Sequence, residues 1–141
     1  MKRQLIAAAA CFVLWSAPAS AHEYPVTISR WVDADTFDGV MEMGFGLMIR
    51  SRFRLMCINA PESGGARKSP EGVQMSEDVK ALLITEGTVD PLKRDAFGRI
   101  LAHLKPKGWD MTLNQRLLEM GAPYYHGLTK KDRAECERRL E

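Results

Sequence analysis

The segment from Leu47 to Ile58 constrains the fold most, because its side chains alternate in character along the chain. On an extended strand, one face would collect the apolar members Ile49, Phe53, Leu55 and Cys57. The opposite face would collect the basic members Arg50, Arg52 and Arg54. Such an arginine stripe is either the solvated exterior of a barrel or a surface that faces phosphates. Spacing alone favours the solvated exterior.

Four further segments are typical of strands. Residues rich in β-formers occupy Tyr24–Ile28 and Thr36–Met43, and Gly44-Phe45-Gly46 predicts a hairpin that leads into the arginine-bearing strand. Two more strands are expected at Thr88–Asp90 and Arg99–Leu104. Strands with turn signals about every ten residues predict a small closed or nearly closed barrel.

Three helices are expected between and after these strands. The first begins at Ser69-Pro70-Glu71, carries the apolar stripe Val73, Val79, Leu82 and Leu83, and ends near Gly87. The second is capped by Thr112, runs from Leu113 to Met120 and ends at Gly121. A charged helix from about Lys130 closes the chain.

The N-terminus has the pattern of an export signal. Lys2 and Arg3 precede an apolar stretch from Leu5 to Trp15, and Ala19-Ser20-Ala21 forms a small-residue cleavage site. An uncleaved membrane anchor is the alternative, but the stretch is short for a hydrocarbon layer of about 30 Å. We therefore expect a signal peptide at residues 1–21, cleaved after Ala21, and one domain at residues 22–141 with no membrane association.

Removal of the signal leaves 120 residues with 18 basic and 18 acidic side chains. This balance excludes a protein that holds nucleic acid by a large overall positive charge, so any affinity for polyanions depends on local placement. Cys57 and Cys136 then lie in an oxidising compartment, where they could form a disulfide. Cys57 could instead be a small core residue. His22, His103 and His126 share no spacing and are interpreted as surface residues.

Three motifs carry a resemblance to a known family. They are Asp33-Ala34-Asp35-Thr36, the run Phe53-Arg54-Leu55 leading into Ile58-Asn59-Ala60-Pro61-Glu62, and Asp95-Ala96-Phe97-Gly98-Arg99. In order and spacing, residues 24–121 resemble the staphylococcal nuclease (thermonuclease) family. The resemblance implies an OB-fold, that is, a five-stranded Greek-key barrel with three helices. It also implies calcium-dependent hydrolysis of phosphodiester bonds in DNA and/or RNA with little sequence specificity. Together with the export signal, it leads us to expect a periplasmic or secreted, monomeric enzyme.

The resemblance also implies a set of site residues. Asp35, Asn59 and the backbone carbonyl of Ala60 would hold Ca²⁺, with Asp33 in the outer shell. Arg54 and Arg99 would bind the phosphate, Glu62 would orient or deprotonate the attacking water, and Tyr125 would stack on substrate. These residue types suit the chemistry, because paired guanidiniums clamp an anionic transition state and calcium prefers oxygen ligands.

The sequence departs from the family pattern at Asn59, at Ala96 and Phe97, and in the segment 123–127, which is shorter than its counterpart. Asn59 stands where the best-known member carries a second ligand aspartate, which predicts weaker calcium binding. Ala96 and Phe97 replace a lysine and a tyrosine that contact a terminal phosphate, which favours internal cleavage over end-directed cleavage. Each motif also has a plainer interpretation, since Asp33 and Asp35 are common turn formers. A catalytically inactive OB-fold module that binds nucleic acid, and a purely structural exported domain, therefore remain alternatives.

Overall fold

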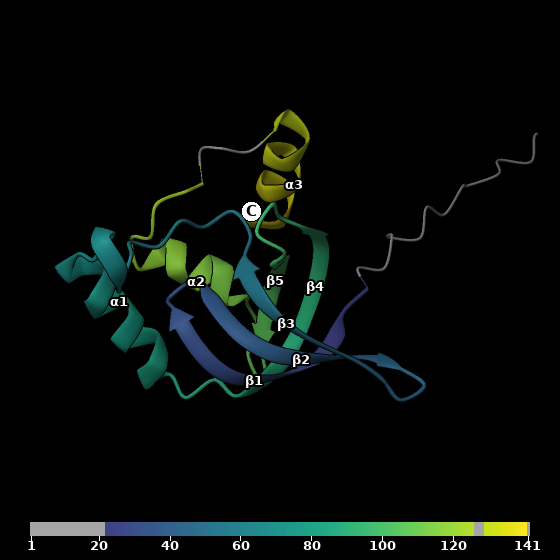
Figure 1. Ribbon diagram of the computed structural model, residues 1–141. Coiled ribbons are helices and arrows are strands. Elements are labelled where there is room, and N and C mark those ends of the chain that lie inside the picture. Colours follow the sequence, from purple (N-terminus) through teal and green to yellow (C-terminus); the bar gives the residue numbers. More distant parts are fainter. Residues whose placement is uncertain (1–21, 126–128, 141) are drawn as a thin grey trace, which may run out of the picture.

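The computed structural model describes residues 22–125 and 129–140, so the predicted signal peptide at residues 1–21 lies outside the described residues. Five strands form a closed barrel in the order β1-β2-β3-β5-β4, with β4 pairing back onto β1 (Figure 1). The strands are β1 (Tyr24–Asp33), β2 (Thr36–Gly44), β3 (Leu47–Leu55), β4 (Glu86–Arg94) and β5 (Ile100–Pro106). All pairings are antiparallel except β3 with β5. The predicted OB-fold class is confirmed.

The barrel is filled from the inward faces of its strands. Phe37 on β2 and Phe53 on β3 are fully buried and stack with their ring centroids 5.1 Å apart. Val89 on β4 and Leu104 on β5 are also fully buried within the same cluster. Alternation along β3 therefore separates apolar from basic side chains, as predicted.

Strand β3 ends at Leu55, three residues before the predicted end at Ile58. Cys57 has a φ of 71° and lies in a turn, so it does not continue the apolar face of the strand. This turn redirects the chain into the segment that carries Asn59, Ala60 and Glu62.

In the described part of the chain, three helices and one short 3₁₀ helix accompany the barrel. They are η1 (Gly65–Arg67), α1 (Pro70–Ala81), α2 (Leu113–Glu119) and α3 (Lys130–Leu140). The Ser69 hydroxyl caps α1, and Thr112 with Gln115 forms a capping box on α2. α1 packs on β1, and α2 packs on β5.

The predicted end of α1 is wrong. The helix stops at Ala81, Leu83 takes a φ of 52°, and both Leu82 and Leu83 are exposed. Gly87 lies inside β4, where a Cβ atom would meet the Lys105 carbonyl oxygen at 2.4 Å. This glycine therefore allows close approach of two strands rather than ending a helix.

Helix α3 is attached to the barrel covalently. Cys57 and Cys136 form a disulfide with a Cα–Cα distance of 5.8 Å, and both residues are buried. Arg139 of α3 also bonds Asp90 on β4, and Lys93 Nζ lies 2.8 Å from Asp132 Oδ1. The disulfide therefore joins α3 to the turn that follows β3.

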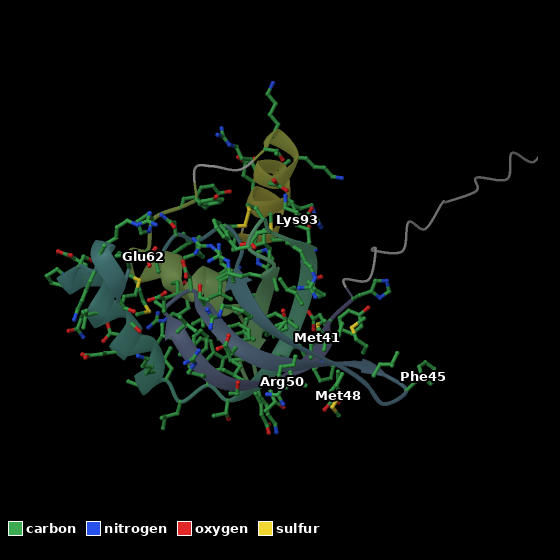
Figure 2. All side chains as sticks on the ribbon, viewed as in Figure 1. Met41, Phe45, Met48, Arg50, Glu62 and Lys93 are labelled. Carbon is green, nitrogen blue, oxygen red and sulfur yellow. A yellow bond between two sulfur atoms is a disulfide. The ribbon has the colours of Figure 1, made fainter. Side chains whose placement is uncertain are left out.

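The hairpin between β2 and β3 projects beyond the barrel (Figure 1). Phe45 lies at its tip, on the opposite side of the molecule from Glu62 (Figure 2). Phe45, Leu47 and Met48 are exposed there. None of the described helices is long and apolar enough to cross a membrane.

Candidate functional site

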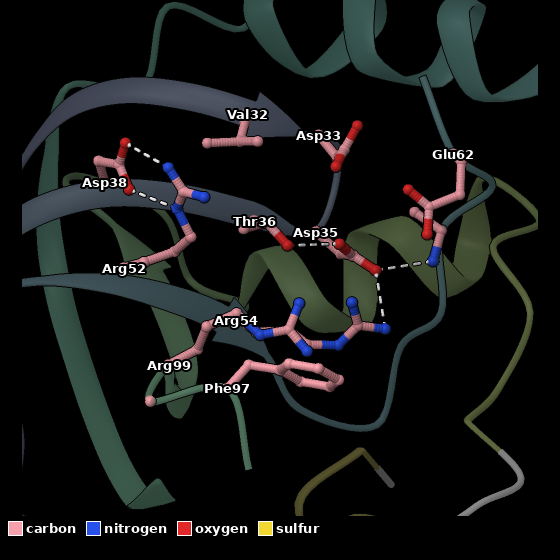
Figure 3. Close-up of a pocket in the computed structure, with 12 residues that line it drawn as sticks. Val32, Asp33, Asp35, Thr36, Asp38, Arg52, Arg54, Glu62, Phe97 and Arg99 are labelled. Atoms are coloured by element: carbon pink, nitrogen blue, oxygen red, sulfur yellow. Dashed lines mark hydrogen bonds and ion pairs between the residues drawn. The ribbon is translucent and has the colours of Figure 1, made fainter. Parts of the chain in front are cut away.

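An open cleft of about 520 Å³ lies where β1 passes into β2, beside the C-terminal end of β3 and the start of β5 (Figure 3). Its lining includes six of the predicted site residues: Asp33, Asp35, Arg54, Ala60, Glu62 and Arg99. They come from three stretches of chain that are far apart in sequence. Closure of the barrel brings these stretches together, because β3 lies between β2 and β5.

Asp35 is the buried carboxylate of the cleft and is only 2% exposed. Thr36 Oγ1 donates to its Oδ1 at 2.8 Å, and the backbone N–H of Ala60 donates to its Oδ2 at 2.9 Å. Burial raises the pKa of Asp35 above its usual 3.8, although nearby Arg54 and these two hydrogen bonds act in the opposite direction. The negative charge on Asp35 is thus incompletely compensated by the protein.

Arg54 links this carboxylate to Asn59. Its Nη2 atom lies 3.5 Å from Asp35 Oδ2 and donates to Asn59 Oδ1 at 2.8 Å. The guanidinium carbon also lies 5.8 Å from the centroid of the Tyr125 ring. One cation therefore contacts two of the predicted metal ligands and the predicted stacking residue.

Arg99 is held by a turn that precedes β5. Its Nε donates to Asp95 Oδ2 at 2.6 Å, while Asp95 Oδ1 accepts from the backbone N–H groups of Phe97 and Arg99. Burial raises the pKa of Asp95, but the bonds from Arg99 and Phe97 outweigh it and lower the pKa below the usual 3.8. Asp95 therefore remains ionised and fixes the Arg99 side chain beside the cleft.

Glu62 is exposed on the facing wall of the cleft (Figure 3). Its carbonyl oxygen accepts from Ser69 N at 3.0 Å, at the start of α1. A Cβ atom on Gly72 would lie 2.1 Å from that same oxygen, so only glycine permits this contact. The beginning of α1 thus fixes the backbone of Glu62 and leaves its carboxylate open to solvent.

Tyr125 lies beside the main cleft rather than in its lining. It borders a smaller cavity of about 60 Å³ together with Arg54, Asp95 and Arg99. Its N–H donates to the Cys57 carbonyl oxygen at 3.1 Å, and the neighbouring Tyr124 forms an isolated bridge with Ile58. The chain after α2 therefore pairs with the loop that carries Asn59.

The donor chemistry of the predicted metal site fits a hard cation. Asp35, Asn59 and Ala60 supply carboxylate, amide and carbonyl oxygens, and the raised pKa of Asp35 marks a buried charge that a cation would compensate. Asp33 lies near enough to Asp35 to raise its pKa further. Among residues 22–125 and 129–140 no cluster of three His, Cys, Asp or Glu side chains suited to a metal occurs.

Two residues that border the cleft, Arg52 and Phe97, were not among the predicted site residues. Arg52 lines it two residues before Arg54, and Phe97 is exposed at its edge with the Arg99 guanidinium 5.2 Å from its ring centroid. Alternation along β3 was the signal that pointed to Arg52.

The interpretation of the histidines as surface residues is wrong at His103. This side chain is 4% exposed, and its Nε2 lies 3.9 Å from Cys57 Sγ. Burial lowers the pKa of His103 from 6.5 to about 4. His22 is exposed, as predicted, whereas His126 lies outside the described residues.

Neither a scan against protein-family models nor a search of curated proteins found a match to this chain.

Proposed function

We propose that this protein is a calcium-dependent nuclease that hydrolyses phosphodiester bonds of DNA and/or RNA with little sequence specificity. The observation that carries the proposal is the convergence of Arg54, Arg99 and Glu62 on one open cleft. Two guanidiniums beside an exposed carboxylate suit an anionic substrate that is attacked by water. Two of the three motifs that resemble the staphylococcal nuclease family supply these residues, and the third supplies Asp35.

The proposed roles follow from the chemistry of each side chain. Arg54 and Arg99 bind the phosphate oxygens and stabilise the additional charge of the transition state. Glu62 accepts a proton from the attacking water, whose oxygen forms the new bond to phosphorus while the bond to the leaving oxygen breaks. Tyr125 stacks on a base or sugar next to Arg54.

Asp35, Asn59 and the carbonyl of Ala60 are the residues proposed to hold Ca²⁺. The ion would polarise the phosphate and reduce its negative charge. Arg54 donates to Asn59 Oδ1, so the position of this guanidinium depends on the same amide that is proposed as a ligand. The chain is further proposed to act as a monomer after export to the periplasm or the medium.

An inactive OB-fold module that binds nucleic acid is the competing function. A binding module needs the arginines but has no use for Glu62, which faces solvent across the cleft from them. Glu62→Gln separates the two functions, because the amide keeps the shape of the side chain and cannot take up a proton.

The test is digestion of plasmid DNA and of single-stranded RNA by the purified protein, with calcium and then with a chelator. We expect cleavage that requires calcium and that Glu62→Gln lowers by about 10²-fold or more. Arg50→Ala, which removes an exposed arginine of the same strand as Arg54, is the matched control and should cleave at the wild-type rate. Binding without cleavage under all conditions would favour the inactive module.

Asn59→Asp tests the placement of the ion. The added charge should lower the calcium concentration for half-maximal activity by about tenfold, because affinity rises with the number of charged ligands. Met48→Glu adds the same charge at the hairpin tip and should leave the calcium requirement unchanged. A calcium requirement that is unchanged or higher in Asn59→Asp would mean that residue 59 is not a ligand.

A further inference from the structure

The arginine stripe of β3 does not end at the proposed catalytic arginine. Arg52 precedes Arg54 by two residues, lies on the same face of the strand and lines the same cleft. Its side chain is 43% exposed, against 16% for Arg54. Arg52 is therefore accessible to a ligand that enters the cleft, and the roles proposed above do not use it.

Asp38 on β2 holds Arg52 in place. Arg52 Nε donates to Asp38 Oδ1 at 2.7 Å, and Arg52 Nη2 donates to Asp38 Oδ2 at 3.1 Å (Figure 3). Arg30 from β1 adds an Nη2 bond to the same Oδ2 at 2.8 Å. The hydrogen bond from Arg52 is the main reason why the pKa of Asp38 falls to about 2. The carboxylate therefore stays ionised, and two guanidiniums around it leave one net positive charge.

These bonds orient Arg52 without using all of its donors. A guanidinium carries five N–H groups, and the contacts with Asp38 involve only the edge formed by Nε and Nη2. The N–H groups on Nη1 belong to the other edge, which is suited to an oxygen anion. A pre-oriented arginine also loses little conformational freedom when a ligand binds.

The spacing of the stripe matches a polynucleotide. The Cα atoms of residues two apart on a strand are separated by about 6.6 Å, close to the distance between successive phosphates of an extended nucleic-acid strand. We infer that Arg52, held by Asp38 and supported by Arg30, is a second phosphate-binding position that takes the phosphodiester next to the one at Arg54. This inference rests on the proposed function for its ligand, and it makes single-stranded chains of several nucleotides the preferred substrate class.

Arg50 provides the matched comparison. It lies on the same face of β3 as Arg52 and is exposed, but its cross-strand partner is Val40, whereas that of Arg52 is Asp38. If the stripe were only a solvated exterior, Arg50→Ala and Arg52→Ala would have equal effects. If Arg52 binds a phosphate, Arg52→Ala should have a larger effect on substrate binding than Arg50→Ala.

The first experiment measures cleavage kinetics on two substrates, one with a single phosphodiester bond and one a single strand of about ten nucleotides. Arg52→Ala should raise KM about tenfold for the long substrate, leave its kcat unchanged, and alter neither constant for the short one. Arg50→Ala should change neither constant for either substrate by more than about twofold. Equal effects of Arg52→Ala on both substrates, or no effect on either, would overturn the inference.

The second experiment measures binding of the long single strand by fluorescence anisotropy in a chelator, so that it does not depend on cleavage. Arg52→Ala should weaken binding and reduce the slope of log Kd against log salt concentration by about 0.7, the value expected for one lost contact with a single strand. A slope equal to that of the wild type would overturn the inference. If binding depends on Arg52 but the wild type never cleaves, the proposed function fails and the phosphate position stands.

Asp38→Asn separates positioning from overall charge. This variant gains one unit of positive charge, so general electrostatic attraction predicts tighter binding to the long strand. Release of Arg52 from its ionised partner instead predicts binding about threefold weaker than that of the wild type. Thermal melting of each variant confirms that it is folded at the assay temperature. Tighter binding by Asp38→Asn would show that Asp38 does not position Arg52.

Discussion

The loop that follows β3 has two different sides, and each pairs an aspartate with an arginine. On the cleft side, Asp35 is buried, lies 3.5 Å from Arg54 and has a raised pKa. On the α3 side, Arg139 contacts both Asp90 and Glu135, and the side chains of Arg138 and Arg139 lower the pKa of Glu135 to about 2.

The difference between these sides lies in how completely charge is compensated. Beneath α3 the carboxylates meet guanidiniums directly, and the Cys57–Cys136 disulfide fixes the helix. In the cleft, burial outweighs the compensation of Asp35, and arginine side chains are held at one edge by carboxylates. The α3 side therefore stabilises the loop, whereas the cleft side leaves the charge of Asp35 and one edge of its arginines available for the ligands proposed above.

The largest expected effect is on the cleft side and concerns rate. Arg54→Lys keeps the charge but loses the planar fork that contacts Asp35 and Asn59, so kcat for plasmid cleavage should fall by about 10²–10³-fold. Circular dichroism should show an intact fold. If the folded Arg54→Lys variant cleaved at nearly the wild-type rate, guanidinium geometry at residue 54 would not be needed for the reaction.

On the α3 side, removal of the Cys57–Cys136 disulfide should lower stability rather than rate. The disulfide closes a loop with a sequence separation of 79. The double variant Cys57→Ala/Cys136→Ala should therefore lose about 4 kcal/mol of unfolding free energy in the chain-entropy description. Its rate, measured at a temperature where it remains folded, should stay within about threefold of the wild type.

Urea unfolding and plasmid cleavage measure these two effects separately. A rate loss as large as that of Arg54→Lys would mean that α3 also positions the cleft. Thiol titration of the unfolded, unreduced wild type without residues 1–21 provides an independent check, because two free thiols would contradict the disulfide.

His103 should make the α3 side sensitive to acid. Its pKa is about 4 in the folded chain and 6.5 in the unfolded chain, so between these values only the unfolded chain binds the proton. Unfolding free energy should therefore fall as pH decreases from about 6.5 to 4, by up to about 3 kcal/mol.

Urea unfolding at several pH values would measure this dependence. His103→Gln removes the titrating group and should flatten the curve in that range, whereas the exposed His22→Gln should leave it unchanged. An equally steep curve for His103→Gln would assign the acid sensitivity to other groups.

The smallest expected changes are in the free energy of unfolding, and they have opposite signs for variants of two cleft carboxylates, Asp35 and Asp38. Asp35→Asn removes a charge that the fold disfavours, and should raise unfolding free energy in calcium-free buffer at pH 7 by about 1 kcal/mol. Asp38→Asn breaks favourable ion pairs with Arg52 and Arg30 and should lower it by up to about 1 kcal/mol. Thermal or urea denaturation would measure both, and changes of the same sign would contradict the contrast.

The positions of most elements followed from local sequence. Alternation from Leu47 onwards identified β3 and its two faces, and the caps at Ser69 and Thr112 identified the starts of α1 and α2. These signals are local because strand periodicity and capping involve residues only a few positions apart. The end of α1 was wrongly predicted for the opposite reason. Gly87 does not end the helix, because its role depends on contact with Lys105 on another strand.

Candidate site residues were found in sequence by their motifs, but their relations are tertiary. No local pattern shows that Arg54 donates to Asn59, that Asp38 binds arginines from two strands, or that Gly72 packs on the Glu62 carbonyl. The burial of His103 against the disulfide also depends on where α3 is attached.

By itself, the sequence determined the strand and helix order, the arginine face of β3 and the chemical types available for a site. The tertiary structure alone decided which charges are compensated, because burial and ion pairing depend on residues brought together by barrel closure. Two aspartates near the start of β2 illustrate this. Asp35 and Asp38 are three residues apart, yet their pKa values shift in opposite directions. Burial raises the pKa of Asp35, and two arginines from neighbouring strands lower that of Asp38.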